Sequence, residues 1–237
     1  MAFVAQDGNV VFWHTDSNQT NWFARPTTEG SNRALFSRDG KRLAISGDRD
    51  LCVCDVSRKT MLLNFPLRGE YAFSLEFSRD GQKLMAGCAS GVVKVWDLGG
   101  QANDVTLWGH TKEVEGLVLS PDGRTLVSVS TDVRVWDLSS QRELIRIKPR
   151  STRFFGCSFS PDGRRLAVGA LDGLITIWDL ASRQEVATLK GHERRVIHVA
   201  FLSDGNTLVS VGEDQVRVWR AASLTEADSA SGKLEQP

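Results

Sequence analysis

The sequence of 237 residues has no excess charge of either sign, because 29 Lys and Arg balance 29 Asp and Glu. This balance argues against a dominant electrostatic attraction to nucleic acid or to an anionic membrane, so neither is an expected partner. Long apolar runs are also missing, since none approaches the roughly 20 residues that a membrane-spanning helix requires. A chain of this length can bury roughly three quarters of its unfolded surface in a core of its own.

Cysteine is scarce, and its spacing carries no metal or redox signature. The four cysteines (Cys52, Cys54, Cys88 and Cys157) include no Cys-x-x-Cys pair. We therefore predict reduced thiols in the core and a reducing, cytoplasmic compartment. Cys52 and Cys54 are two residues apart, which places both on one face if the segment is a strand.

The motifs of common enzyme classes are missing too. The sequence contains neither a G-x-x-x-x-G-K-[ST] phosphate loop nor a G-x-S-x-G nucleophile elbow. His192 and Glu193 begin like a zinc-binding helix, but Val196 stands where the second histidine would be. The Asp-Gly pairs lack the alternating acidic ligands of a calcium loop. We therefore predict no catalytic residues, no metal and no cofactor; an enzyme that uses a central channel is the least favoured alternative.

What the sequence does contain is a repeat with a period of about 41 residues. Tryptophans recur at steps of 40 to 42 residues, with a cysteine in one position of the series: Trp13, Cys54, Trp96, Trp136, Trp178 and Trp219. Asp-Gly pairs recur in phase with them, at Asp39, Asp80, Asp122, Asp162 and Asp204. Two markers that share one period are hard to obtain by chance, so the chain is built from repeated units.

Each repeat unit has the pattern of four short strands and no helix. We call the six residues of the tryptophan series the ladder residues. The positions one and three before each ladder residue are apolar and mostly β-branched, which is typical of a strand with period two. A leucine stands four residues after each marker aspartate, at Leu43, Leu84, Leu126, Leu166 and Leu208, and begins a second strand. Asp-Gly between two such runs predicts a hairpin turn, because glycine accepts positive φ at low cost. Radial stacking of such sheets buries both of their faces, so an all-β propeller is predicted; a β-sandwich would not need a repeat of fixed length.

The markers predict about six blades, of which the first and last are incomplete. The predicted propeller spans residues 1–220, and 221–237 is expected to be a polar tail, either a short helix or disordered. If Phe3 is aligned with Leu126, blade one begins at its second strand, and blade six ends at its third. We therefore expect an open arc, or part of a seven-bladed ring that would need roughly 50 more residues upstream. Met1 is then expected to be an internal start or a cut, and the open blade edges could support self-association.

Two segments carry a resemblance to a known family: "WGHTKEVEGLVLSPDGRTLVSVSTDVRVWDL" (108–138) and "KGHERRVIHVAFLSDGNTLVSVGEDQVRVW" (190–219). In each, Gly-His, Asp-Gly and Trp-Asp or its remnant follow in order, which resembles the WD40 repeat family. The resemblance implies two buried hydrogen-bonded tetrads, one formed by His110, Ser128, Asp132 and Trp136 and the other by His192, Ser210, Asp214 and Trp219. Other blades depart from the pattern, with Cys54 in place of Trp, Ser90 in place of Asp, and Pro149-Arg150 in place of Gly-His.

The resemblance also implies a non-catalytic platform that binds proteins or peptides. The loops expected on its top face carry basic and aromatic residues, and the partner-binding candidates are Trp108, Lys112, Arg150, Arg153, Phe154, Arg194 and Arg195. They are either solvated loop charges with core aromatics, or a site for an acidic or phosphorylated peptide. The turn style resembles bacterial WD40 chains, so the alternative is a C-terminal docking module of a larger signalling enzyme, such as a Ser/Thr protein kinase.

Overall fold

The computed structural model describes residues 2–4, 10–14, 19–23, 33–47, 50–67, 69–99, 104–148 and 153–221, the first three ranges as backbone only. These residues form strands and connecting turns, without a helix. The strands form six antiparallel sheets, which we call blades one to six in chain order. The predicted all-β propeller fold is confirmed.

Blades two to five have four strands each, and each sheet follows the order of the chain from its inner to its outer strand. Their strands are β4 (Arg33–Phe36), β5 (Arg42–Ser46), β6 (Asp50–Asp55) and β7 (Thr60–Pro66); β8 (Ala72–Phe77), β9 (Lys83–Cys88), β10 (Val93–Asp97) and β11 (Val105–Leu107); β12 (Gly116–Leu119), β13 (Thr125–Val129), β14 (Val133–Asp137) and β15 (Arg142–Ile147); β16 (Phe154–Phe159), β17 (Arg165–Ala170), β18 (Ile175–Asp179) and β19 (Gln184–Leu189).

Blades one and six have three strands each among the described residues. Blade one contains β1 (Ala2–Val4), β2 (Val10–His14) and β3 (Gln19–Phe23), and blade six contains β20 (Val196–Phe201), β21 (Thr207–Gly212) and β22 (Val216–Arg220). Within the described residues, blade one has no strand at the inner position that the other blades fill, and blade six has no outer strand. This division into inner and outer strands agrees with the one predicted from the repeat.

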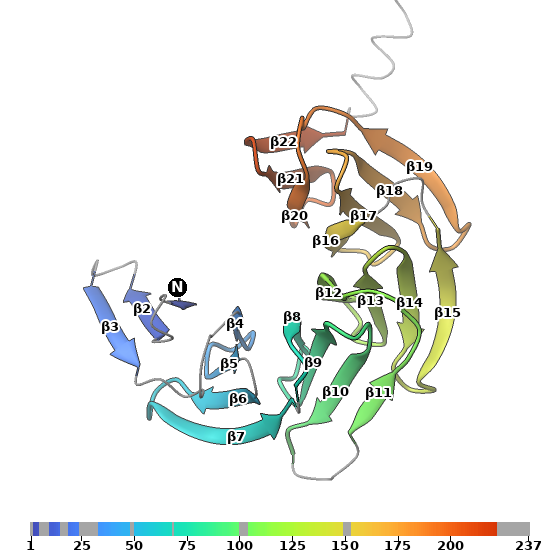
Figure 1. Cartoon of the computed structure of the whole chain (residues 1–237). Helices are drawn as coiled ribbons and strands as arrows, with labels where there is room; N and C mark the ends of the chain where they lie inside the picture. The colour runs from blue at the N-terminus through green and yellow to red at the C-terminus, as the bar shows by residue number, and fades with distance from the viewer. Residues whose placement is uncertain are drawn as a thin grey trace, which may run out of the picture.

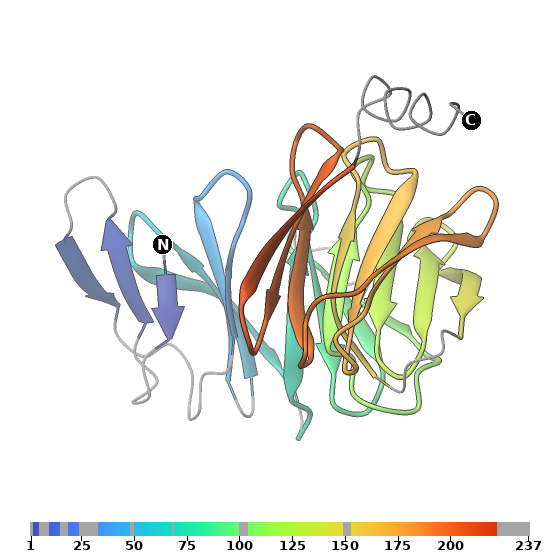
Figure 2. The same cartoon turned by 90° about the horizontal axis from the view of Figure 1, so that it is seen from above.

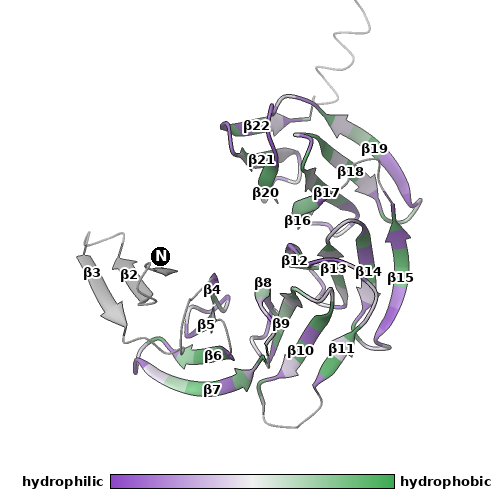
Figure 3. Cartoon of the chain, viewed as in Figure 1, coloured by the Kyte–Doolittle hydropathy of each residue, from purple (hydrophilic) through white to green (hydrophobic). Residues whose placement is uncertain are grey.

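The blades stand side by side around an arc, with inner strands β4, β8, β12, β16 and β20 toward the centre (Figures 1 and 2). Blades one and six lie at the two ends of this arc (Figure 1). Hydrophobic residues recur along the inner and middle strands of blades two to six (Figure 3). The second strands β5, β9, β13 and β17 are buried at consecutive positions, as expected for sheets that are covered on both faces.

The alignment of Phe3 with Leu126 was wrong by two residues. Leu126 lies opposite the ladder residue Trp136, whereas Phe3 lies opposite Val11. The reason is the length of the hairpin connection. In blade one the paired residues Val4 and Val10 are six positions apart, whereas in blade four Val129 and Val133 are four positions apart. The connection in blade four is the shortest of the six between a second and a third strand.

The core lies between neighbouring blades rather than inside one sheet. Val133 and Val135 of β14 are buried against Phe154 and Leu166 of blade five. In blades two to six the predicted leucine lies directly opposite the ladder residue, as Leu126 does opposite Trp136. Burial of these apolar faces is the main favourable term in the stability of such a stack.

The Asp-Gly turns repeat one local structure at the connection between the first and second strands. In blade two, Ser37 Oγ donates to Asp39 Oδ1 at 2.6 Å and accepts from the N–H of Arg42 at 3.0 Å. Gly40 has a φ of +68°, a conformation that residues with a Cβ seldom adopt. The predicted hairpin turns are therefore present in blades two to six, where each turn glycine has a positive φ.

The four cysteines are free thiols; Cys52, Cys54 and Cys88 are buried, and Cys157 is half-buried. The Sγ atoms of Cys52 and Cys54 lie 3.9 Å apart on one face of β6, as their spacing predicted. Within the described residues we find no helix of the length and apolarity needed to span a bilayer.

Candidate functional site

One face of the arc is built from the loops that enter the inner strands and the connections between second and third strands. Backbone hydrogen bonds tie the two sets together: Phe154 N–H donates to Ser130 O at 2.8 Å, Leu171 N–H to Arg153 O at 2.9 Å, and Glu213 N–H to Arg195 O at 3.2 Å. We call residues 69–71, 89–92, 108–115, 130–132, 153, 171–174, 190–195 and 212–215 the loop face. The turns with the Asp-Gly pairs connect the opposite ends of the strands.

A hydrogen-bonded chain runs from the core of blade four to the loop face. Trp136 Nε1 donates to Ser128 Oγ at 2.8 Å, Ser128 Oγ lies 2.6 Å from His110 Nε2, and His110 Nδ1 lies 2.5 Å from Asp132 Oδ1. All four residues are buried. The structure thus brings together the first predicted tetrad.

The proton positions in this chain follow from its two ends. An indole N–H only donates, so the Ser128 hydroxyl accepts from Trp136 and gives its own proton to His110 Nε2. The single N–H of the neutral His110 ring is therefore at Nδ1, which donates to Asp132. Burial lowers the pKa of His110, which favours this neutral imidazole. Every polar group of this hydrogen-bonded series then has a partner, and the imidazole stays uncharged.

Asp132 is also held by two arginines. Its Oδ2 accepts from Arg146 Nε at 2.6 Å and lies 3.2 Å from Arg134 Nη2. Burial alone would raise the pKa of Asp132, but His110, Arg146 and Arg134 together keep it below its ordinary value. Arg134 forms a second ion pair with Glu143 of β15 and lies over the Trp136 ring, 6.0 Å from its centroid.

Blade six repeats the tetrad nearer the surface. Trp219 Nε1 donates to Ser210 Oγ at 2.8 Å, Ser210 Oγ lies 2.7 Å from His192 Nε2, and His192 Nδ1 lies 2.8 Å from Asp214 Oδ1. Asp214 also accepts the N–H of Glu193 at 3.1 Å. Burial would raise the pKa of Asp214, but the hydrogen bonds from His192 and Glu193 hold it below its ordinary value.

The other described blades lack this chain because they lack its hydroxyl. Val168 stands in blade five where Ser128 stands in blade four, and Trp178 Nε1 donates instead to Thr176 Oγ1 at 3.1 Å. Cys54 fills the tryptophan position of blade two and is buried. Residues 149 and 150 of blade five, in the Gly-His position, lie outside the described part.

The partner-binding candidates on the loop face fall into two groups. Arg153 and Arg195 both lie over the Phe155 ring, 5.7 and 5.4 Å from its centroid. Arg153 forms ion pairs with Glu113 at 3.6 Å and with Glu115, and Arg195 with Glu213 at 2.7 Å. These two arginines are therefore ordered by acidic neighbours, which the sequence did not predict.

The second group is exposed. Trp108 is 75% accessible, and Lys112 and Arg194 are exposed in the same set of loops. Phe154, by contrast, was wrongly placed among the contact residues, because it is fully buried and packs between blades four and five. A bulge between Phe154 and Cys157 changes which side chains face outward, so Phe155 is the accessible phenylalanine. Arg150 lies outside the described residues.

A hollow of about 390 Å³ opens among the inner strands beside this surface. Phe73, Phe155 and Ile197 give it much of its apolar lining. Its polar lining consists of Arg33, Ser74, Glu115, Cys157 and His198, and the Ser74 hydroxyl donates to the backbone O of Val114. It contains no nucleophile paired with a base. Apolar and aromatic lining with few polar groups suits a side chain of a partner better than a reaction.

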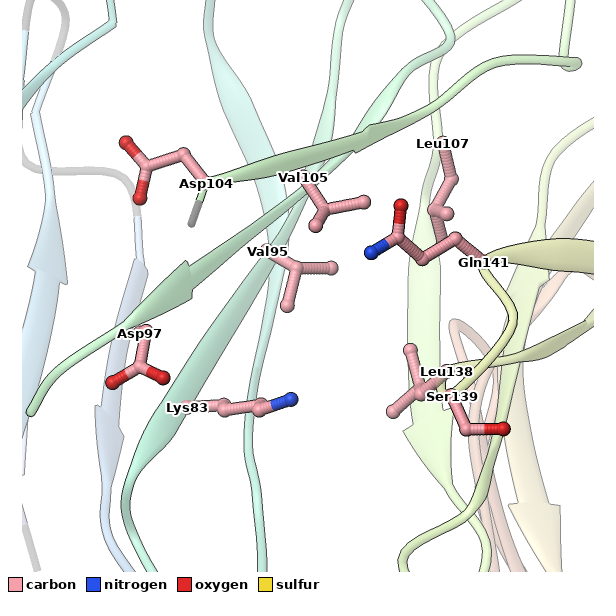
Figure 4. A pocket seen from close by; sticks show the side chains of 9 residues that line it. All are labelled: Lys83, Val95, Asp97, Asp104, Val105, Leu107, Leu138, Ser139 and Gln141. Carbon is pink, nitrogen blue, oxygen red and sulfur yellow. The ribbon is translucent and has the colours of Figure 1, made fainter. Parts of the chain in front are cut away.

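A second hollow of about 550 Å³ lies between the outer strands of blades three and four (Figure 4). Val95, Leu107 and Leu138 line it together with Lys83, Asp97 and Asp104. Its only hydroxyl, that of Ser139, donates to Asp137 at 2.6 Å. The described residues hold no group of three or more His, Cys, Asp or Glu placed to bind a metal.

Comparisons with known proteins agree with the architecture. Residues 67–97, 103–137, 147–179 and 183–220, more than half of the chain, match the family model "WD domain, G-beta repeat". The chain is 30% identical over 129 residues to the WD repeat-containing protein SL1-17 of Schistosoma mansoni, covering 53% of this chain and 42% of that protein. It is 33% identical over 97 residues to the WD repeat and SOCS box-containing protein 1 of Takifugu rubripes, covering 40% and 23%.

A further relative is the pre-mRNA-processing factor 19 homolog 2 of Arabidopsis thaliana, 31% identical over 128 residues and covering 53% of this chain and 23% of that protein. The chain thus spans less than half the length of these curated relatives. Among solved structures, a chain of the mitotic checkpoint complex superposes with a TM-score of 0.75 at 23% identity, covering 94% of this chain and 84% of that one. This likeness concerns the fold. The repeat, the blades and the family match together show that the chain belongs to the WD40 repeat family.

Proposed function

We propose that this chain is a non-catalytic scaffold that binds a protein or peptide partner on the loop face. WD40 propellers are generally protein-interaction scaffolds, and the chain belongs to that family. The single observation that carries the proposal is the exposed Trp108, which is 75% accessible on the same face as Arg194 and the Arg153–Phe155–Arg195 stack. Tryptophan and arginine are the residues most enriched among those that dominate binding energy at interfaces.

The exposed cations of the loop face, rather than its net charge, favour a partner with an acidic or phosphorylated residue, because the face has five Lys and Arg against eight Asp and Glu. Arg194 and Lys112 are exposed cations, and the Arg153 and Arg195 guanidinium groups are held in place by Glu113, Glu115 and Glu213. A carboxylate or phosphate that approaches this group would compete with the acidic neighbours for the arginines. An apolar side chain of the same peptide would enter the hollow lined by Phe155 and Ile197. The four free thiols support a reducing, cytoplasmic setting for this binding.

The experiment is a binding screen of the full chain against a peptide array that contains phosphoserine, glutamate and neutral series with matched apolar positions. The variants are Trp108→Ala and the double charge reversal Arg194→Glu with Arg195→Glu. The matched control is Arg124→Glu with Arg164→Glu, because these exposed arginines lie in the Asp-Gly turns of the opposite face. We expect the loop-face variants to lose capture of the acidic series and the control to keep it. Unchanged capture by the charge-reversed chain would contradict the proposal.

A further inference from the structure

The outer edge of blade six differs from that of its neighbours. β14 and β18 are each paired on their outer side with a fourth strand, β15 and β19, whereas β22 pairs only with β21 among the described residues. The edge of β22 therefore presents backbone N–H and C=O groups in the geometry that accepts another strand. This edge is distinct from the loop face, and the inference drawn from it does not depend on the proposed function.

Blade four shows what such an added strand provides. Glu143 of β15 lies directly opposite Trp136 and forms an ion pair with Arg134, whose guanidinium lies 6.0 Å from the Trp136 ring centroid. The side chain of Arg134 is 8% accessible, so this carboxylate partners a charge that is almost out of water. Removal of the carboxylate would leave the charge of Arg134 buried without this partner, which costs folding free energy. An arginine at this position therefore favours a carboxylate on the neighbouring strand.

Blade six has the arginine and the tryptophan of this arrangement but, among the described residues, no fourth strand with a carboxylate. Arg217 lies opposite Ser210, as Arg134 lies opposite Ser128, and its guanidinium is 5.8 Å from the Trp219 ring centroid. A Cβ added at Gly191 would be 2.8 Å from Arg217 Nη1, so the arginine is packed closely against the loop that enters blade six. Yet Arg217 forms no ion pair with any residue that the structure describes.

We propose that the edge of β22 binds an extended segment of a partner protein whose carboxylate lies opposite Trp219 and pairs with Arg217. The two neighbouring blades define the rest of the segment. Ile145 and Ile147 of β15, and Ala187 and Leu189 of β19, follow the glutamate by two and four residues and lie opposite apolar positions of the third strand. The recognised pattern is therefore Glu-x-apolar-x-apolar, antiparallel to β22.

The charges argue for a partner rather than a second copy. None of the six strands in the two three-stranded blades contains Asp or Glu. Pairing between the terminal blades of two copies would therefore provide no carboxylate for Arg217. Pairing of β22 with the β22 of another copy would also bring the cations of Arg217 and Arg220 together, which is unfavourable.

The probe is a fluorescent synthetic peptide with the sequence of residues 139–148, which contains β15, titrated with the full chain and followed by anisotropy. We expect saturable binding that weakens about tenfold or more when the peptide carries Glu143→Gln, the effect of losing a charged hydrogen bond. The chain variant Arg217→Met keeps the aliphatic stem on Trp219 and should weaken binding of the parent peptide to a similar extent. Arg217→Lys should give an intermediate affinity, because it keeps the charge without the planar fork.

The matched control is Arg220→Met, because Arg220 lies on the same strand, three positions along, and its side chain points to the other face. It should bind like the parent chain. Equal affinity for the Glu and Gln peptides would overturn the proposal without reference to the folding of any variant. Binding that appears only after residues 222–237 are deleted would also overturn it, because the chain would then fill its own edge. A dimer of the chain that the peptide fails to dissociate would also overturn the proposal, because a second copy would then occupy the edge of β22.

Discussion

The indole N–H of Trp136 donates to the hydroxyl of Ser128 at 2.8 Å, and Trp219 and Ser210 form the same bond at 2.8 Å in blade six. The two bonds have the same length but different surroundings. Trp136 is 3% accessible between two neighbouring blades, whereas Trp219 is half-buried on the last described blade. The same chemistry should therefore contribute differently to stability at the two positions.

The substitution Trp136→Ala should lower the free energy of unfolding by about 3–5 kcal/mol, the usual range for truncation of a large buried side chain. It leaves a cavity and removes the donor to Ser128. The matched variant Trp219→Ala should cost less, because Trp219 already contacts solvent. Chemical denaturation followed by circular dichroism measures both values. A melting temperature for Trp136→Ala equal to that of the parent chain would contradict the expected core role.

Much of this architecture could be predicted because the same residue pattern occurs in several blades of the chain. The tryptophan ladder and the leucine column identify residues that lie opposite each other, and the Asp-Gly pairs identify turns. Each signal is local to one hairpin, where spacing along the chain determines register. Contacts between blades are different. The ion pairs of Arg153 with Glu113 and Glu115 depend on how closely two blades approach, and no spacing within one repeat encodes that distance.

The mistaken role of Phe154 has a similar physical origin. A strand alternates its side chains with period two, but a bulge between Phe154 and Cys157 interrupts this alternation. Without the bulge, Phe155 would share a face with the buried Phe159 and Phe154 would lie on the other face, which is the reverse of the observed burial. The alignment of Phe3 with Leu126 failed for another reason. It assumed the same hairpin length in both blades, but the connection in blade one is two residues longer than that in blade four.

The substitution Asp132→Asn should destabilise blade four more than a surface change would. The carboxylate accepts from Arg146 and His110 and lies beside Arg134. An amide would remove the counter-charge of Arg146 and one of the two counter-charges of the buried Arg134. A loss of about 3 kcal/mol is expected for breaking such a buried pair. Urea unfolding measures it. Asp172→Asn, at an exposed connection of blade five, serves as the control and should leave the midpoint unchanged.

Glu76 should make stability fall as the pH rises above about 4.5. It lies in a hollow with Arg38, Arg79 and Leu119, and burial raises its pKa from 4.5 to about 7, against the effect of the Leu119 N–H that it accepts. The folded chain thus retains a proton that the unfolded chain releases. The stability that this provides is complete below pH 4.5 and is lost as the pH rises through about 7.

The substitution Glu76→Gln removes this titration while it keeps the shape of the side chain. Relative to the parent chain, the variant should gain about 2–3 kcal/mol between pH 5 and pH 8. Guanidinium unfolding at the two pH values measures the difference. Glu193→Gln, at an exposed loop position, is the control and should show the same pH dependence as the parent. A difference between Glu76→Gln and the parent that does not change with pH would show that burial of the carboxyl is not what couples stability to protons.

The substitution Gly156→Ala should test how closely the inner strands of blades five and six approach. A Cβ at this position would lie 2.7 Å from Ile197 O and 2.8 Å from His198 Cα, both backbone atoms that cannot rotate away. The two strands would have to separate, at a cost of about 2–3 kcal/mol for overpacking. Gly40→Ala provides the contrast, because a Cβ there meets nothing within 4 Å and only the φ of +68° is unfavourable, which costs about 1 kcal/mol. Thermal unfolding of the two variants should rank Gly156→Ala as clearly the less stable, and it should also weaken peptide capture by the loop face, since Phe155 and Ile197 would move apart. Equal stability of the two variants would mean that the inner strands have room to adjust.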